Sequence, residues 1–126
     1  MSTRVIKVAN VIIPVADQDQ AVEFYTEKLG MEKLVELPFG PGFRWIEVAP
    51  AGVETTIALC PPAPEVTPGN KQTGISLHVA DAEAYHAELT AAGVDVDESI
   101  GHFEGVPPTF WLRDPEGNIL QVTEAS

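Results

Sequence analysis

Cysteine and basic residues are scarce in this chain of 126 residues, and long apolar runs are missing. Its one cysteine, Cys60, cannot form a disulfide within the chain. Seven Lys and Arg residues stand against 19 Asp and Glu residues, and the resulting net charge of −12 repels nucleic-acid phosphates and anionic membranes. No stretch approaches the roughly 18 consecutive apolar residues of a membrane span. We therefore expect no nucleic-acid and no membrane partner.

Several catalytic motifs are also missing. The sequence has no nucleophile elbow, no glycine-rich phosphate loop and no H-E-x-x-H helix, which excludes the hydrolase, nucleotide-binding and metalloprotease classes that depend on them. The first ten residues, MSTRVIKVAN, interrupt their apolar positions with Lys7 and Asn10, unlike the core of a signal peptide. Together with the unpaired cysteine, this pattern predicts a cytoplasmic protein.

The residues that are present predict a globular fold. Hydrophobic residues make up 44% and charged residues 21%, and 126 residues suit one compact domain. Residues 5–15 are rich in β-branched residues, which predicts a strand. Asp17 then caps a helix, and Gly30 ends it. The apolar face of this helix is Ala21, Phe24, Tyr25 and Leu29. Further strands are expected over 31–37, 43–49 and 54–60.

The pattern then restarts after a proline-rich stretch, 61–73, that is typical of a linker. A strand is expected over 74–79, and Asp81 and Gly93 delimit a second helix. The apolar face of that helix is Ala82, Tyr85, Leu89 and Ala92. Two final strands, 109–113 and 118–123, flank the turn Asp114-Pro115-Glu116-Gly117.

Helix caps, helix stops and hairpin turns recur at one spacing. Asp17 and Asp81 are 64 residues apart, Gly30 and Gly93 are 63 apart, and Gly52 and Gly117 are 65 apart. Three independent markers at nearly one offset indicate a tandem duplication within a single domain over 1–126. The two modules, about 5–60 and 74–124, are each too small to bury a helix and a sheet well. We expect them to pack together, either within one chain or across a dimer.

Four segments carry a resemblance to a known family: VANVIIPVAD over 8–17, AVEFYTEKLG over 21–30, WIEVAPAG over 45–52 and FWLRDPEGNILQV over 110–122. They resemble the glyoxalase / bleomycin resistance protein / extradiol dioxygenase superfamily, also called the vicinal oxygen chelate proteins. The resemblance implies an α+β fold of paired βαβββ modules. Their curled mixed sheet encloses a cleft and carries the helices on its convex side. The resemblance also implies a homodimer.

The same resemblance locates the positions at which metal-binding relatives hold a divalent ion. These positions are Asn10 and Thr56 in the first module and Gly74 and Gln121 in the second. This set contains neither a carboxylate nor an imidazole, the groups that bind divalent ions tightly. We therefore expect no cofactor, with a divalent metal as the alternative.

Alternation along the strands then predicts which side chains line the implied cleft. They are Ile12, Trp45, Glu47, Thr56, Ala58 and Cys60 in the first module and Ser76, His78, Phe110, Leu112 and Ile119 in the second. Trp111, of opposite parity to Phe110, should face the helix. The strand pairings behind Trp45 and Phe110 assume tight turns at Gly52 and Gly117. A slip of one residue would turn these side chains to the opposite face of the sheet.

Some of these residues can carry chemistry. His78 is a candidate general base or hydrogen-bond donor, against the simpler interpretation of a histidine satisfied at a strand end. Glu47 is a candidate base or an anchor for a cation. The simpler interpretation is that Glu47 is a hairpin residue that faces water. The ligand-binding candidates are Asn10, Trp45, Thr56, Ser76, Phe110 and Gln121.

The remaining histidines, the cysteine and the other aromatic residues are weaker candidates. His86 is expected to be exposed on a helix flank, and Cys60 to be a buried filler. His102 and Phe103 are expected in a loop over the cleft. Phe39 and Phe43 also lie near cleft-forming strands, where aromatic rings stack on flat or cationic ligands.

Two functions fit these residues. The first is capture of a small, cationic or aromatic ligand without a metal, similar to the antibiotic-sequestering members of the superfamily. The second is an enzyme of the lyase, isomerase or dioxygenase type. It would use an atypical metal site or His78 or Glu47 as a base.

Overall fold

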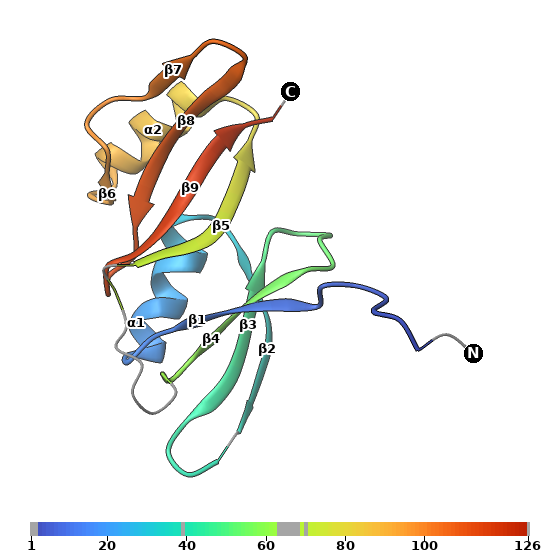
Figure 1. The fold of residues 1–126 in the computed structure, drawn as a ribbon. Helices are drawn as coiled ribbons and strands as arrows, with labels where there is room; N and C mark the ends of the chain where they lie inside the picture. The colour runs from blue at the N-terminus through green and yellow to red at the C-terminus, as the bar shows by residue number, and fades with distance from the viewer. Residues whose placement is uncertain (1–2, 39, 63–68, 70, 126) are drawn as a thin grey trace. The chain divides into compact units, whose positions relative to one another are not determined.

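The computed structural model describes residues 3–38, 40–62, 69 and 71–125. The chain divides into two compact units, residues 1–66 and 67–126 (Figure 1). Each unit combines helix with a mixed β-sheet, so the α+β class predicted from the sequence is confirmed. Over the described ranges, no helix has the length and apolar character needed to cross a membrane.

The described residues of unit 1 form four strands and one helical segment. They are β1 (Asn10–Pro14), α1 (Gln18–Glu23), the π-helical turn η1 (Phe24–Lys28), β2 (Glu32–Pro38), β3 (Arg44–Ala49) and β4 (Thr56–Cys60). The strand order is β1-β4-β3-β2, with β1 parallel to β4 and the other pairs antiparallel. The first strand of the unit therefore pairs with its last.

The helix of unit 1 begins and ends at the predicted residues. The Asp17 carboxylate accepts a hydrogen bond from the backbone N–H of Gln20 at 2.9 Å, which satisfies one of the open donors of the first turn. Gly30 ends the helical segment with a φ of +78°, a conformation that side chains disfavour. The buried rings of Phe24 and Tyr25 pack edge to face, with centroids 5.2 Å apart.

Unit 2 repeats this arrangement. Its elements are β5 (Lys71–Val79), α2 (Ala82–Ala91), β6 (Asp95–Val96), β7 (Gly101–Phe103), β8 (Val106–Arg113) and β9 (Asn118–Glu124). The strand order is β5-β9-β8-β6, and β7 pairs with β8. The Asp81 carboxylate caps α2 by accepting from the N–H of Ala84 at 3.0 Å. In both units the first strand pairs with the last strand, and the last strand pairs with the strand before it, as a duplicated module predicts.

Several predicted boundaries in unit 2 were wrong. Strand β5 begins at Lys71, inside the stretch interpreted as a linker, because Lys71 and Gln72 pair with the start of β9. The remaining described part of 61–73 is residues 61–62 and 69, whereas residues 63–68 and 70 lie outside the described chain. Strands β6 and β7 were missed because two or three residues carry too little periodicity to detect.

Each sheet has one face that packs against its own helix, which we call the helix face. In unit 1 this face is made by Ile13, Ile46, Val48, Ile57 and Leu59, all buried. In unit 2 it is made by Phe110, Leu112, Leu120 and Val122, also buried. We call the opposite side of each sheet the helix-free face. Because side chains alternate along a strand, the neighbours of these residues lie on the helix-free face.

Tyr85 on α2 predicts how stability depends on alkaline pH. Burial, with a smaller contribution from Glu88, raises the pKa of Tyr85 from 10.0 to about 12. Between these values the unfolded chain loses the phenolic proton while the native chain keeps it, so the free energy of unfolding should fall as pH rises from 10 to 12. Urea unfolding of the wild type and Tyr85→Phe across this range measures the effect. Parallel losses in the two proteins would contradict it.

Candidate functional site

The helix-free face of unit 1 brings together the predicted residues of that half. Asn10 on β1 lies opposite Thr56 on β4, and Glu47 on β3 lies opposite Ala58 on β4. Trp45 stands two residues before Glu47 on the same face. The orientation predicted for Asn10, Trp45, Glu47 and Thr56 is therefore confirmed.

Glu47 is the centre of this cluster. The indole Nε1 of Trp45 donates to Oε2 of Glu47 at 2.6 Å, and the hydroxyl of Thr56 donates to Oε1 at 2.7 Å. Each carboxylate oxygen therefore has a neutral donor that fixes its position. Among the described residues, no Lys, Arg or His forms an ion pair with Glu47. Two neutral donors therefore hold its negative charge in a fixed orientation.

Cys60 ends β4 on the same face, and its side chain is buried. Burial raises the pKa of the Cys60 thiol, the charge of Glu47 adds to this effect, and a hydrogen bond from the backbone of Ile46 opposes it. A raised pKa keeps the sulfur protonated and therefore poorly nucleophilic. The interpretation of Cys60 as a buried filler is confirmed.

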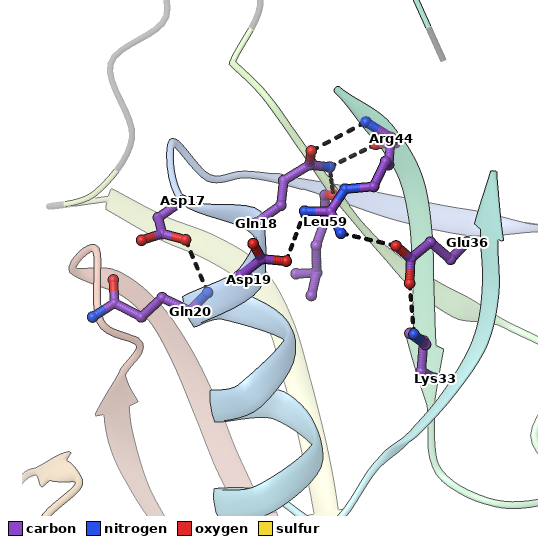
Figure 2. Close-up of polar contacts among 8 residues, drawn as sticks. All are labelled: Asp17, Gln18, Asp19, Gln20, Lys33, Glu36, Arg44 and Leu59. Atoms are coloured by element: carbon purple, nitrogen blue, oxygen red, sulfur yellow. Dashed lines mark hydrogen bonds and ion pairs between the residues drawn. The ribbon is translucent and has the colours of Figure 1, made fainter. Parts of the chain in front are cut away.

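The strands that carry this cluster are tied to the start of α1 by Gln18, a residue that the sequence analysis did not single out. Its buried side-chain amide donates to the carbonyls of Arg44 at 2.6 Å and Leu59 at 2.9 Å, and its Oε1 accepts from the N–H of Arg44 at 3.1 Å. Figure 2 shows these bonds joining the helix to two strands. Arg44 immediately precedes Trp45, so Gln18 fixes the backbone next to the candidate site.

Four charged side chains lie beside the hydrogen bonds of Gln18 and form ion pairs with one another (Figure 2). The Arg44 guanidinium bonds the carboxylates of Asp19 and Glu36, each at 2.8 Å, and Lys33 bonds Glu36 at 2.5 Å. Hydrogen bonds from Lys33 and Arg44 lower the pKa of Glu36, and those to Asp19 and Glu36 raise the pKa of Arg44. These charges are paired with one another, in contrast to the charge of Glu47.

In unit 2 the pairing of β5 with β9 confirms part of the predicted face. Ser76 lies opposite Gln121 and His78 lies opposite Thr123, so these four side chains share the helix-free face. The hydroxyl of Thr123 lies 3.4 Å from that of Ser76 and 3.3 Å from that of Thr109. His78 is exposed on this face.

The orientation predicted for Phe110 was wrong. Phe110 lies opposite Val122, is 1% exposed and packs its ring edge to face on His86 of α2, with centroids 5.0 Å apart. Phe110 and Leu112 therefore belong to the helix face. Trp111, which was expected to face the helix, lies opposite Gln121 on the helix-free face.

The turn between β8 and β9 explains the reversal. The N–H of Gly117 donates to the carbonyl of Asp114 at 2.9 Å, and the N–H of Asp114 donates to the carbonyl of Asn118 at 3.0 Å. Gly117 has a φ of +84°. A left-handed glycine at the last position of a four-residue turn makes the hairpin loop one residue longer than a two-residue loop. One extra residue turns every side chain of the first strand to the other face.

The weaker candidates also differ from their predictions. His86 is half-buried rather than exposed, and its Nε2 lies 2.7 Å from the carbonyl oxygen of Asp97. His102 and Phe103 belong to strand β7, not to a loop, and both are exposed. Phe43 is half-buried just before β3, and Phe39 lies outside the described residues.

The four positions that correspond to the family's metal ligands do not suit a divalent ion. Gly74 has no side chain, and the hydroxyl of Thr56 is donated to Glu47. Asn10 and Gln121 offer only neutral amide groups. In the described ranges, no three His, Cys, Asp or Glu side chains are grouped as a metal site requires. Tight binding of a divalent ion needs carboxylate, imidazole or thiolate ligands, so this donor set does not fit one.

The chain is therefore a small α+β protein built from a repeated βαβββ unit, in which the helix-free face of each sheet carries polar and aromatic side chains. The model of the Glyoxalase/Bleomycin resistance protein/Dioxygenase superfamily matches residues 7–122. The chain belongs to this superfamily, and the resemblance noted in the sequence is confirmed.

Solved structures and curated relatives agree with this assignment. TnmS3, an antibiotic binding protein from Streptomyces sp. CB03234, is 31% identical over 99% of this chain and 100% of its own, with a TM-score of 0.86. A superfamily member from Sphaerobacter thermophilus DSM 20745 is 31% identical over 96% and 98%, with a TM-score of 0.89. The uncharacterized protein YetH of Bacillus subtilis strain 168 is 28% identical over 124 residues, 94% of this chain and 98% of its own.

Proposed function

We propose that this protein captures a small aromatic cation, without a metal, on the helix-free face of unit 1. The observation that carries the proposal is the Glu47 carboxylate, which two neutral donors hold in place and no cation neutralises among the described residues. A fixed, uncompensated negative charge beside an indole ring favours a flat cation. The similarity to TnmS3, an antibiotic binding protein, supports capture as the general function.

Catalysis is the alternative, because the superfamily name also includes glyoxalases and dioxygenases. The described residues favour capture over this alternative. Both oxygens of Glu47 already accept hydrogen bonds from Trp45 and Thr56, so the carboxylate is engaged within the protein rather than directed at a substrate proton. The positions of the family's metal ligands do not suit a divalent ion either. Homodimer formation and a cytoplasmic location remain part of the proposal.

A matched pair of probes tests the role of Glu47. N-methylacridinium is a flat cation, and acridine has nearly the same shape but is neutral near pH 7.5. We expect calorimetry to show N-methylacridinium binding more tightly than acridine. Glu47→Gln should weaken the binding of the cation by roughly tenfold or more, since two opposite unit charges about 4 Å apart interact by about 1 kcal/mol in water and about 4 kcal/mol near a protein surface. The affinity for acridine should change little.

Glu54→Gln is the matched control, because it removes the same charge from an exposed residue in the loop between β3 and β4. It should leave both affinities close to those of the wild type. Equal losses in Glu47→Gln and Glu54→Gln would mean that only net charge matters. That result, or no binding of the cation to the wild type, would refute the proposed function.

A further inference from the structure

Three neighbouring strands of unit 1 each bring one polar side chain to the same place on the helix-free face. Asn10 on β1 lies opposite Thr56 on β4, and the Thr56 hydroxyl donates to Oε1 of Glu47 on β3 at 2.7 Å. Neighbouring strands are about 4.8 Å apart, so one bound group can contact the side chains of both Asn10 and Thr56. These three side chains therefore converge on one position beside the Glu47 carboxylate.

Thr56 serves the carboxylate at this position. It stands at one of the family's metal-ligand positions, but its hydroxyl proton is committed to Glu47 and its side chain is buried. Glu47, which is not one of those positions, is held at its other oxygen by Trp45 at 2.6 Å. The residue at a metal-ligand position thus orients a negative charge instead of coordinating an ion.

The charge at this position distinguishes between two kinds of cation. Asn10 and Thr56 are neutral, so Glu47 supplies one negative charge to the group bound beside it. A divalent ion holds its water strongly and needs several carboxylate or imidazole ligands in exchange. One fixed carboxylate balances the charge of a monovalent organic cation, but only half that of a divalent ion. The same place that does not suit a metal ion therefore suits the organic cation.

From these contacts we infer that the positive charge of the captured ligand occupies, in unit 1, the place that the metal ion has in metal-binding relatives. Glu47 then balances the charge of the ligand, and Thr56 is a positioning residue for Glu47. A divalent ion and the ligand must compete for this place once the missing metal ligands are supplied. The inference rests on the proposed function and adds to it the location of the ligand's charge.

The double variant Asn10→His/Thr56→Glu tests this location, because it adds an imidazole and a second carboxylate beside Glu47. Calorimetry with Zn²⁺ should show that it binds the ion at least roughly a hundredfold more tightly than the wild type. Saturating Zn²⁺ should then weaken its binding of N-methylacridinium by roughly tenfold or more. The same Zn²⁺ concentration should leave the affinity of the wild type within about twofold.

Asn10→His/Thr55→Glu is the matched control. It introduces the same two residue types, but successive side chains point to opposite faces, so the new carboxylate is turned away from Glu47. Its Zn²⁺ affinity should stay within roughly fivefold of that of the wild type. If the first double variant does not fold, Asn10→His/Thr56→His replaces it, because this pair adds two imidazoles and no further negative charge.

Two results would overturn this inference alone. If Zn²⁺ binds the variant tightly and leaves its N-methylacridinium affinity unchanged, the charge of the ligand lies elsewhere. If the folded variant binds Zn²⁺ no better than the matched control, the three side chains do not converge on one position. In both cases a wild type that binds N-methylacridinium through Glu47 would still support the proposed function. If the wild type does not bind N-methylacridinium, the proposed function and the inference fail together.

Discussion

Phe110→Ala should lower the free energy of unfolding by about 3–5 kcal/mol, the usual cost of truncating a buried aromatic residue. The Phe110 ring is 1% exposed and packs on His86 of α2, so its removal leaves a cavity between helix and sheet. This loss is large compared with the total stability of about 5–15 kcal/mol of a typical domain. Urea unfolding followed by circular dichroism measures the change.

Phe103→Ala makes the same chemical truncation at a residue that is 64% exposed. It should change the free energy of unfolding by no more than about 0.5 kcal/mol. A loss below about 1 kcal/mol in Phe110→Ala would show that the ring is not part of the core. In that case the register of β8, and with it the position of Trp111, would have to be revised.

The contrast between Phe110 and Trp111 shows where sequence reasoning reaches its limit. Both residues fit a strand, and their burial depends only on whether the following hairpin contains an even or an odd number of residues. The sequence Asp-Pro-Glu-Gly correctly predicted a turn but not the extra left-handed residue at Gly117. Between β3 and β4 of unit 1 the pairing has the predicted parity, so Trp45 and Glu47 lie on the predicted face.

Local signals in the sequence were more reliable than pairings between distant strands. The caps at Asp17 and Asp81 use contacts within three residues, and the structure has both. The bonds of Gln18 to Arg44 and Leu59 span 26 and 41 residues, and no local pattern indicates them. A glutamine next to a helix cap is ordinarily a surface residue, so only the fold reveals this one as buried.

Gln18 also connects the fold to the candidate site. Its amide bonds the backbone of Arg44, which precedes Trp45, and the carbonyl of Leu59, which lies on the strand that begins at Thr56. The two donors to Glu47 thus come from strands that Gln18 ties to the helix. Stability and binding should therefore both respond to this residue.

Gln18→Met should lower the free energy of unfolding by about 3 kcal/mol, because two carbonyls and one N–H lose their partner at nearly constant side-chain volume. Gln20→Met, which changes an exposed glutamine two residues further along α1, should stay within about 0.5 kcal/mol of the wild type. Chemical unfolding of the two variants measures this difference. If the two variants are equally stable, the buried bonds of Gln18 contribute nothing to the fold.

The same variant should weaken N-methylacridinium binding even under conditions where it remains folded. Without Gln18, the backbone next to Trp45 is no longer fixed, and the hydrogen bonds that orient Glu47 depend on that backbone. When side chains of a site are no longer held in the binding conformation, ordering them during binding costs free energy, and the affinity falls. Titration of folded Gln18→Met at low temperature, beside Gln20→Met, separates this effect from unfolding. Wild-type affinity in folded Gln18→Met would show that Trp45 and Glu47 are held in place without Gln18.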